Sequence, residues 1–180
     1  MRTGSDLRAY SLRRAWQTRQ MAADRAMLLV LWDIDHTLVE TRGVGTQLYG
    51  QAFEAVTGRT FEHPADPTGR TEQAIFWETL ELHGVAPSHE LETGYHVELP
   101  RQYGRHFDLL QRKGGVLPGA RECLAALSEC PDVVQTVLTG NFRDVAVVKL
   151  RAFGLDHFMD FDAGAYGEDH RERATLVSMA

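Results

Sequence analysis

The chain of 180 residues has only two cysteines, Cys123 and Cys130. They lack the C-x-x-C spacing of a metal or redox pair. Their separation of seven residues is about two helical turns, so we expect both on one buried helix face, where cysteine packs as a small hydrophobic residue. A structural disulfide is therefore not expected, and the pair favours a reducing compartment, which we take to be the cytoplasm.

Long apolar runs and lysines are scarce as well. No run approaches the roughly 18 apolar residues of a membrane-spanning helix, so we expect no membrane association.

Only two residues are lysines, and outside residues 1–25 the chain holds 13 basic against 23 acidic residues. Affinity for a nucleic-acid backbone needs clustered Lys and Arg, so this acidic body argues against nucleic-acid binding. Any phosphate that the protein binds must be held locally.

Residues 1–26 are predicted to form a basic, disordered N-terminal extension. Residues 1–25 hold six arginines and two aspartates, a composition typical of organelle transit peptides. They lack the apolar segment of a secretory signal. The alternative is that folded sequence begins near Met27 and that the preceding residues are a loose extension or a misplaced start.

Three apolar runs predict strands: Leu28–Trp32, Val133–Leu138 and, more weakly, Phe158–Phe161. The first two are almost continuously apolar or β-branched, which is typical of strands covered on both faces in a parallel sheet. The segment after the second strand predicts a helix that stops at Gly154, so strand, helix and third strand would form a right-handed βα unit.

About a hundred residues separate the first two strands, far more than an ordinary crossover needs. Apolar periodicity predicts helices over 46–58, 71–84 and 89–114, the last broken by Pro100. We therefore predict the α/β class, with an incomplete Rossmann-like parallel sheet core and an inserted α-helical cap. The predicted core comprises residues 27–40 and 116–180, and the cap residues 41–115.

Polar side chains follow both main strands: Asp33 and Asp35 after the first, and Thr139, Gly140 and Asn141 after the second. Ligands of open α/β sheets bind beyond the carboxyl ends of the strands. Extended residues i and i+2 point the same way, and two close carboxylates either raise one pKa or recruit a cation. This pattern suits phosphoryl transfer, with Asp33 as nucleophile, Asp35 as acid and base, and Mg²⁺ to offset the charge.

Supporting residues are expected around these aspartates. Thr37 would fix the turn and hydrogen-bond a carboxylate, while the segment 139–141, at a helix N-terminus, would hold phosphate oxygens. In the cap, Arg70 of "PTGRTEQ" is placed to meet an anionic substrate tail, although an ordinary surface arginine is an equal alternative.

These residues resemble the haloacid dehalogenase superfamily. Its first motif, D-x-D-x-T after an apolar strand, is matched by "LLVLWDIDHTLV", and its second, a strand ending in Thr or Ser, by "VVQTVLTGN". The insert resembles the superfamily's first-type helical cap, and the likeness, covering 27–180, is to phosphoglycolate phosphatase-like members. It implies a Mg²⁺-dependent phosphatase acting on a small phosphorylated metabolite through an aspartyl-phosphate, with Asp33 and Asp35 as the metal ligands.

Two positions depart from the superfamily pattern. His36 replaces the usual glycine, and we expect a neutral turn residue there rather than a catalytic one. The superfamily's third motif is a Lys or Arg that binds phosphate. We assign this role to Arg173 and keep Lys149 as the alternative. Lys149 lies eight residues past Asn141, about 12 Å along a helix axis, which we expect to carry it away from the site.

The fourth motif, an apolar strand followed by Gly-Asp and a further Asp, has no match before Ala180. "GEDHRE" from Gly167 imitates it without a buried strand, so we expect a truncated enzyme with too few carboxylates for Mg²⁺. The alternatives are a catalytically incomplete remnant or binding protein, a phosphomutase, or a dehalogenase. A dehalogenase attacks carbon and needs no proton donor, so Asp35 favours the phosphatase.

Overall fold

The computed structural model describes residues 27–179, so the predicted basic extension of residues 1–26 lies outside the described residues. Strand β1 (Leu28–Trp32) pairs in parallel with β4 (Val133–Val137), and Leu28 stands opposite Val133. The two main predicted strands and their parallel pairing are confirmed. Together with the helices described below, they confirm the α/β fold class.

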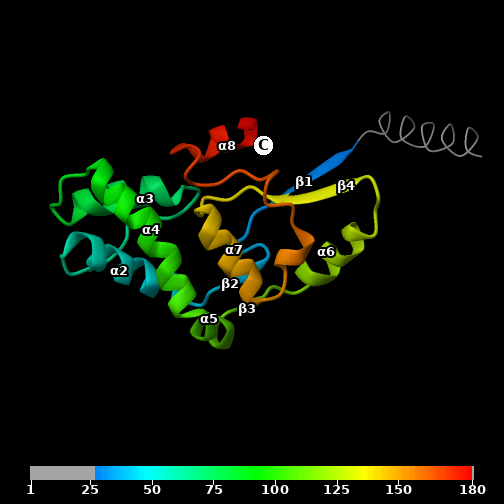
Figure 1. The fold of residues 1–180 in the computed structure, drawn as a ribbon, viewed down its shortest axis with the longest axis horizontal. Coiled ribbons are helices and arrows are strands. Elements are labelled where there is room, and N and C mark those ends of the chain that lie inside the picture. The colour runs from blue at the N-terminus through cyan, green and yellow to red at the C-terminus, as the bar shows by residue number, and fades with distance from the viewer. Residues whose placement is uncertain (1–26, 180) are drawn as a thin grey trace, which may run out of the picture.

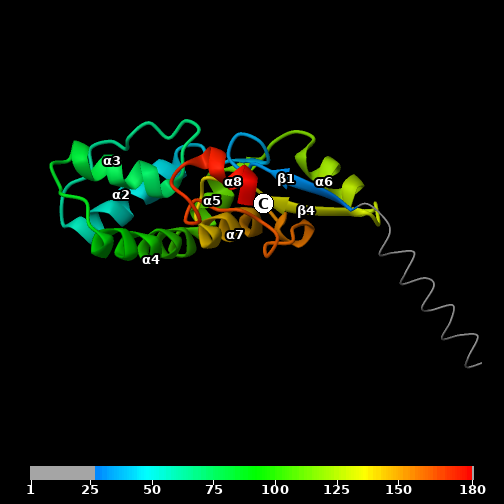
Figure 2. The same cartoon turned by 90° about the horizontal axis from the view of Figure 1, so that it is seen from above.

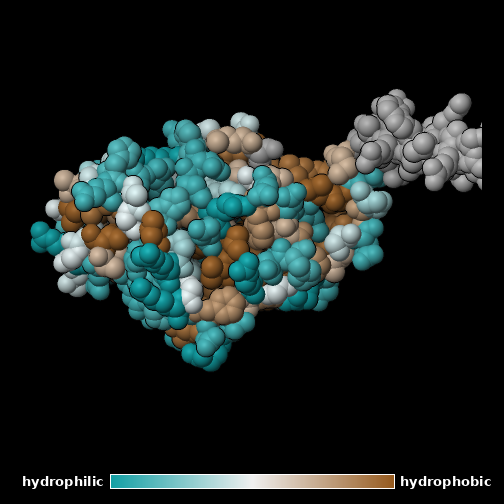
Figure 3. All heavy atoms as spheres, in the orientation of Figure 1, coloured by the Kyte–Doolittle hydropathy of each residue, from teal (hydrophilic) through white to brown (hydrophobic). Residues whose placement is uncertain are grey.

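The predicted burial of the first strand on both faces is wrong. Leu28 is 59% exposed and Leu29 is 37% exposed. Within residues 27–179, β4 is the only strand that pairs with β1, so the other edge of β1 has no strand beside it. Figure 3 shows apolar surface where the described chain begins.

The predicted third strand, Phe158–Phe161, is also wrong. Its start belongs to a short 3-10 helix, η1 (Asp156–Phe158). Beyond it the chain meets β4 through single contacts: the Asp160 amide donates to the Gln135 carbonyl at 2.8 Å, and Ala165 forms an isolated bridge with Leu138. The apolar side chains that suggested a strand instead pack on the hydrophobic cluster of the α/β part.

Four helices lie within residues 41–115: α2 (Val44–Thr57), α3 (Glu72–Leu82), α4 (His89–Arg105) and α5 (Phe107–Lys113). Their starts and ends follow local signals. Gly58, at φ 65°, ends α2, and the Thr71 hydroxyl accepts a hydrogen bond from the Ala74 amide at the start of α3.

The predicted break at Pro100 is wrong, because α4 continues through it and ends at Arg105. A proline removes one helical hydrogen bond, but packing on both sides of it compensates here. Tyr95, Leu99 and Tyr103, four residues apart on one helix face, are at most 2% exposed.

A short antiparallel ribbon of β2 (Val39–Glu40) and β3 (Gly115–Val116) joins the two connections between the inserted helices and the rest of the chain. It lies at the predicted borders of core and cap. The division into a core of 27–40 and 116–180 and a cap of 41–115 itself stays a prediction.

Helix α6 (Ala120–Ser128) follows β3, α7 (Arg143–Ala152) follows β4, and α8 (Arg173–Met179) follows η1. The predicted burial of the cysteines is wrong: both are free and exposed. Helix α6 buries Ala120 and Leu124, and Cys123 lies about 100° around the helix from Leu124. Cys130 lies past the end of the helix.

Helix α7 lies between the two parts of the molecule and packs against both (Figure 1). Figure 2 shows α2, α3 and α4 on one side of it and the β1–β4 pair on the other. Val145 of α7 belongs to the hydrophobic cluster of the inserted helices, whereas Ala146 and Leu150 belong to that of the α/β part. Among the described helices, none has both the length and the hydropathy needed to cross a membrane.

Candidate active site

A cavity of about 420 Å³ lies where the carboxyl ends of β1 and β4 meet the inserted helices. The inserted helices contribute Tyr49, Glu72 and Tyr103 to its lining. Every predicted site residue except Thr37 also lines it, namely Asp33, Asp35, Arg70, Thr139, Gly140, Asn141, Lys149 and Arg173. The structure thus brings together residues that lie far apart in the sequence.

Asp35 is held by Lys149 and Asn141. The Lys149 Nζ lies 2.9 Å from Oδ1 and 2.8 Å from Oδ2 of Asp35, and the Asn141 Nδ2 donates to Oδ2 at 2.8 Å. Burial acts to raise the pKa of Asp35, but the Lys149 ammonium and these hydrogen bonds outweigh it and hold the pKa below its usual value. Asp35 is therefore a carboxylate at neutral pH.

The expectation that α7 carries Lys149 away from the site is wrong. Helical side chains tilt toward the N-terminus of their helix, and that tilt shortens the distance to the site. The Lys149 side chain, which is 4% exposed, therefore reaches Asp35 directly, and its Nζ also donates to Oδ1 of Asn141, just before α7 begins, at 2.6 Å. Burial lowers the pKa of Lys149, but the Asp35 carboxylate opposes this, and the net pKa lies above the ordinary lysine value.

Asp33 has a cation of its own. Its Oδ2 lies 2.7 Å from Nη2 of Arg173, the first residue of α8, and its Oδ1 accepts a hydrogen bond from the Ile34 amide at 2.9 Å. Arg173 and Lys149, between which the sequence left a choice, are both in the cavity. Each neutralises a different aspartate.

The segment after β4 is fixed by its own hydrogen bonds. The Thr139 hydroxyl accepts from the Asn141 amide at 3.2 Å and from Asn141 Nδ2 at 2.7 Å. Glu168 accepts from the Arg143 amide at the start of α7 at 2.9 and 3.0 Å. Among the described residues, the Gly140 amide has no acceptor, so it is the backbone donor of this segment left for a ligand.

The turn after Asp35 depends on the backbone. The exposed Thr37 donates its amide to the Ile34 carbonyl at 3.3 Å, but its hydroxyl has no hydrogen-bond partner between residues 27 and 179. The predicted bond from Thr37 to a carboxylate is therefore not formed. His36 has a φ of 60°, in the left-handed region that favours glycine, which fits the expected turn role.

Arg70 lines the cavity, but its guanidinium is already engaged within the inserted helices. It lies 2.6 Å from Glu78 and donates to the carbonyls of Asp66 and Ala74 at 3.3 and 3.2 Å. Contact with an anionic substrate tail stays a prediction, and it would require Arg70 to leave Glu78.

The start of α3 is docked directly on the segment after β4. The Glu72 amide donates to the Gly140 carbonyl at 2.7 Å, and the Thr71 hydroxyl donates to the Arg171 carbonyl at 2.9 Å. The Arg171 guanidinium carbon lies 3.7 Å from the centroid of the Trp77 ring. Neither Glu72 nor Arg171 was predicted to take part, because no local pattern indicates that they face the core.

Replacing Gly140 by alanine is expected to disrupt this docking. The new Cβ would collide with the Arg70 carbonyl oxygen, a backbone atom that cannot rotate away, so α3 must shift. We expect a loss of about 1–3 kcal/mol in the free energy of unfolding and faster proteolysis around residue 70. In the matched control Gly104→Ala the added Cβ meets nothing within 4 Å, and stability should stay the same or rise. Equal stability of the two variants would contradict the docking.

Glu72 has an unusual environment for an acid. Some of the residue is exposed, but its Oε2 atom is fully buried and has no hydrogen-bond partner among the described residues. Burial raises the pKa of Glu72 to about 7, although the charge of Lys149 acts in the opposite direction.

Glu72 should make stability depend on pH. Its pKa rises from 4.5 to about 7 on folding, so the folded state binds the proton more tightly. The resulting stabilisation is complete below the unfolded pKa and is lost as the pH rises through about 7. We expect wild type to lose about 2–3 kcal/mol relative to Glu72→Gln between about pH 4 and about pH 8. Chemical denaturation at both pH values measures this difference, and parallel curves would contradict it.

Two carboxylates of the cavity, Asp33 and Asp35, would hold a divalent cation, although each now pairs with a cationic side chain. Residues 27–179 contain no cluster of three or more His, Cys, Asp or Glu side chains that could hold a metal. However, Mg²⁺ in phosphoryl-transfer sites is commonly bound through one or two carboxylates, with substrate phosphate and waters completing its shell. Asp33 and Asp35, in one cavity, meet that minimum.

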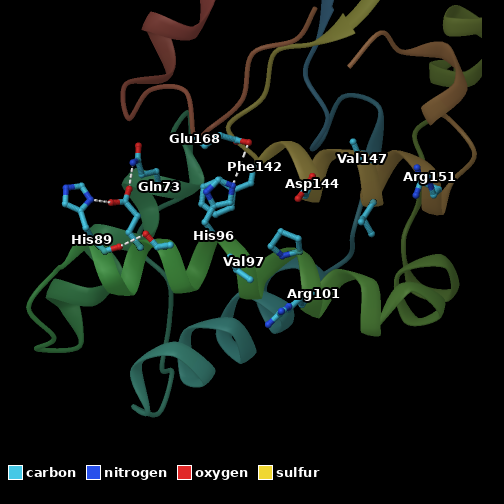
Figure 4. Close-up of a pocket in the computed structure, with 14 residues that line it drawn as sticks. Gln73, His89, His96, Val97, Arg101, Phe142, Asp144, Val147, Arg151 and Glu168 are labelled. Atoms are coloured by element: carbon cyan, nitrogen blue, oxygen red, sulfur yellow. Dashed lines mark hydrogen bonds and ion pairs between the residues drawn. The ribbon is translucent and has the colours of Figure 1, made fainter. Parts of the chain in front are cut away.

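A second hollow, of about 900 Å³, lies between α4 and α7 and contains none of the predicted site residues (Figure 4). His96 stacks on Phe142 there, with ring centroids 4.4 Å apart, and its Nε2 lies 3.9 Å from Glu168. Two pairs of charged groups lie along this groove, His89 with Glu92 and His96 with Glu168. Two arginines that line it pair with acids outside it, Arg101 with Glu98 and Arg151 with Asp156.

Known proteins share the fold. No curated protein matches the chain by sequence. A hydrolase from Pseudomonas syringae superposes with a TM-score of 0.55 at 19% identity, covering 81% of this chain and 64% of its own. A predicted phosphoglycolate phosphatase from Haemophilus somnus superposes with a TM-score of 0.51 at 16% identity, covering 82% of this chain and 65% of its own. The CbbY protein of Rhodobacter sphaeroides, in complex with phosphate, superposes with a TM-score of 0.54 at 15% identity, covering 79% of this chain and 64% of its own.

The chain therefore spans about two thirds of the length of these structures. The profile of the haloacid dehalogenase-like hydrolases matches residues 30–175, which include both aspartates, the inserted helices, α7 and Arg173. This confirms the resemblance seen in the two sequence motifs. The chain belongs to the haloacid dehalogenase-like hydrolases.

Proposed function

We propose that the protein is a Mg²⁺-dependent phosphatase that hydrolyses a small phosphomonoester through an aspartyl-phosphate on Asp33. The observation that carries this proposal is the pairing of two aspartates with two separate cations around one cavity. The crystal structures of CbbY with phosphate and with xylulose-1,5-bisphosphate support a phosphorylated substrate by analogy.

In the first step an oxygen of Asp33 forms a bond to phosphorus while the bond from phosphorus to the alcohol oxygen breaks. Arg173, which now contacts Asp33 at 2.7 Å, would move onto the phosphate oxygens and leave the nucleophile free. The Gly140 amide supplies a further donor. Asp33 and Asp35 would hold Mg²⁺, whose charge would offset the negative charge of phosphate and carboxylate.

Asp35 would serve as acid and then as base. Its ion pair with Lys149 keeps it ionised, which suits the second step, in which it takes a proton from the water that attacks phosphorus. That attack releases inorganic phosphate and restores Asp33. In the first step the incoming anionic phosphate raises the pKa of Asp35, so that the carboxyl can protonate the departing alkoxide.

The assignment is tested by measuring phosphate release from small phosphomonoesters with and without Mg²⁺. Because the chain spans about two thirds of the length of the compared structures, the assay is run on this chain and on any longer product of the same coding sequence. We expect hydrolysis that requires Mg²⁺. Hydrolysis that is equally fast with a chelator present would contradict the metal requirement, and halide release from a haloacid would favour a dehalogenase.

A further inference from the structure

The Glu72 carboxylate is the unsatisfied acceptor of the active-site cavity. Among the described residues, three other buried side-chain atoms also lack a partner, on Gln51, Trp77 and Tyr95, but none of these residues lines the cavity. A buried polar atom without a partner costs about 1–3 kcal/mol, so its position calls for an explanation.

Helix stability does not explain this position. An acidic residue in the first turn favours a helix by interacting with free backbone amides. At the start of α3, however, the Thr71 hydroxyl caps the helix by accepting from the Ala74 amide, and the Glu72 amide donates to Gly140. The Oε2 of Glu72 accepts from none of these groups. The Oε2 atom is therefore buried without contributing a cap.

Two hydrogen-bond donors of the cavity, Lys149 and Tyr49, already donate to groups other than Glu72. Lys149, whose charge acts on Glu72, directs its ammonium to both oxygens of Asp35 and to Asn141 Oδ1 at 2.6 Å. The Tyr49 hydroxyl donates to Thr79 at 2.9 Å. The Oε2 atom of Glu72 thus has no donor among the described residues, and a molecule bound in the cavity can supply one.

The position of Glu72 relative to the catalytic groups is also fixed. Its amide is tied to the Gly140 carbonyl, one residue from Asn141, which binds Asp35. A phosphate placed at Asp33 would thus leave the alcohol part of the ester on the side of the inserted helices, where Glu72 lies. The cation that could have attracted a negative tail there, Arg70, is paired with Glu78.

We propose that Glu72 selects the substrate by accepting a hydrogen bond from a hydroxyl or ammonium group on the alcohol part of the phosphomonoester, and that it disfavours a carboxylate in that place. This inference rests on the proposed phosphatase function. Its physical basis is that a buried acceptor gains most from a donor and is left unpaired, or repelled, by any other group.

Four two-carbon esters test the proposal because they differ only at the far end: 2-aminoethyl phosphate, 2-hydroxyethyl phosphate, ethyl phosphate and phosphoglycolate. Kd by calorimetry and kcat/KM by phosphate release are measured at about pH 8.5, where Glu72, with a pKa of about 7, is ionised. The proteins compared are wild type, Glu72→Gln and the control Glu122→Gln. Glu122 is an exposed acid in the first turn of α6, away from the cavity. Thermal unfolding shows that each variant is folded.

In wild type and in Glu122→Gln we expect the two donor-bearing esters to be favoured over ethyl phosphate roughly 10- to 100-fold, with phosphoglycolate the poorest. In Glu72→Gln the affinity and kcat/KM for the amino ester should fall about tenfold or more, and those for phosphoglycolate should rise. The hydroxyl ester should change little, because the amide oxygen still accepts. Unchanged ratios in Glu72→Gln, or phosphoglycolate as the best ligand of wild type, would overturn the proposal.

The two measurements separate this inference from the proposed function. Selective binding without hydrolysis would support the role of Glu72 and count against the phosphatase. Hydrolysis with ratios that Glu72→Gln leaves unchanged would do the opposite. If none of the four esters binds, the assignment of Glu72 as a substrate acceptor is wrong.

Discussion

Replacing Lys149 by methionine is expected to lower the free energy of unfolding by about 2–3 kcal/mol and to abolish most of the activity. Removing one partner of a buried ion pair typically costs about 3–5 kcal/mol, because the other charge is left uncompensated. The Asp35 side chain keeps 35% exposure, so water can replace part of the lost interaction, and we place the effect below that range. Urea denaturation monitored by circular dichroism measures the loss.

The chain supplies a matched control, because its only other lysine is Lys113 at the exposed end of α5. Lys113→Met should change stability by less than about 0.5 kcal/mol. A double-mutant cycle with Asp35→Asn isolates the pair: the double variant should be more stable than the sum of the single losses implies. Additive losses, or equal effects of the two lysine substitutions, would show that Lys149 and Asp35 are not coupled.

The parts of the fold that could be predicted from sequence are those encoded by local patterns. The apolar runs of β1 and β4 predicted a parallel pair, and the aspartates directly behind β1 placed the site at its carboxyl end. Helices α2 and α3 were predictable because glycine and threonine mark their ends and apolar residues recur at helical spacing.

The errors arise where tertiary contacts override local patterns. Packing of Leu99 and Tyr103 keeps α4 continuous across Pro100, and the apolar residues 158–161 bury themselves without pairing as a strand. Distance along a helix axis misplaced Lys149, because it ignored the tilt of the side chain toward the N-terminus of the helix. Glu72 carried no signal, since its role depends on how α3 docks on Gly140.

Replacing Asp33 by asparagine is expected to reduce phosphate release by about 10⁴-fold or more, to the background of the assay. The amide is nearly the same size as the carboxylate and can still accept from the Ile34 amide, which now lies 2.9 Å from Oδ1. The fold should therefore persist. The amide nitrogen is not a nucleophile, however, and Arg173 loses the negative charge that it contacts at 2.7 Å. Steady-state kinetics and thermal unfolding on the same preparation distinguish loss of chemistry from loss of structure.

Phosphate binding provides a further readout for Asp33→Asn. Because the substitution removes one negative charge from the cavity and frees Arg173, we expect inorganic phosphate to bind at least as tightly as in wild type. Asp108→Asn, an exposed aspartate in the first turn of α5, is the matched control and should retain both activity and phosphate affinity. Phosphate release by Asp33→Asn within tenfold of wild type would mean that another group attacks phosphorus. Weaker phosphate binding would instead mean that Asp33 helps to hold the anion, for example through a shared cation, and does not only attack it.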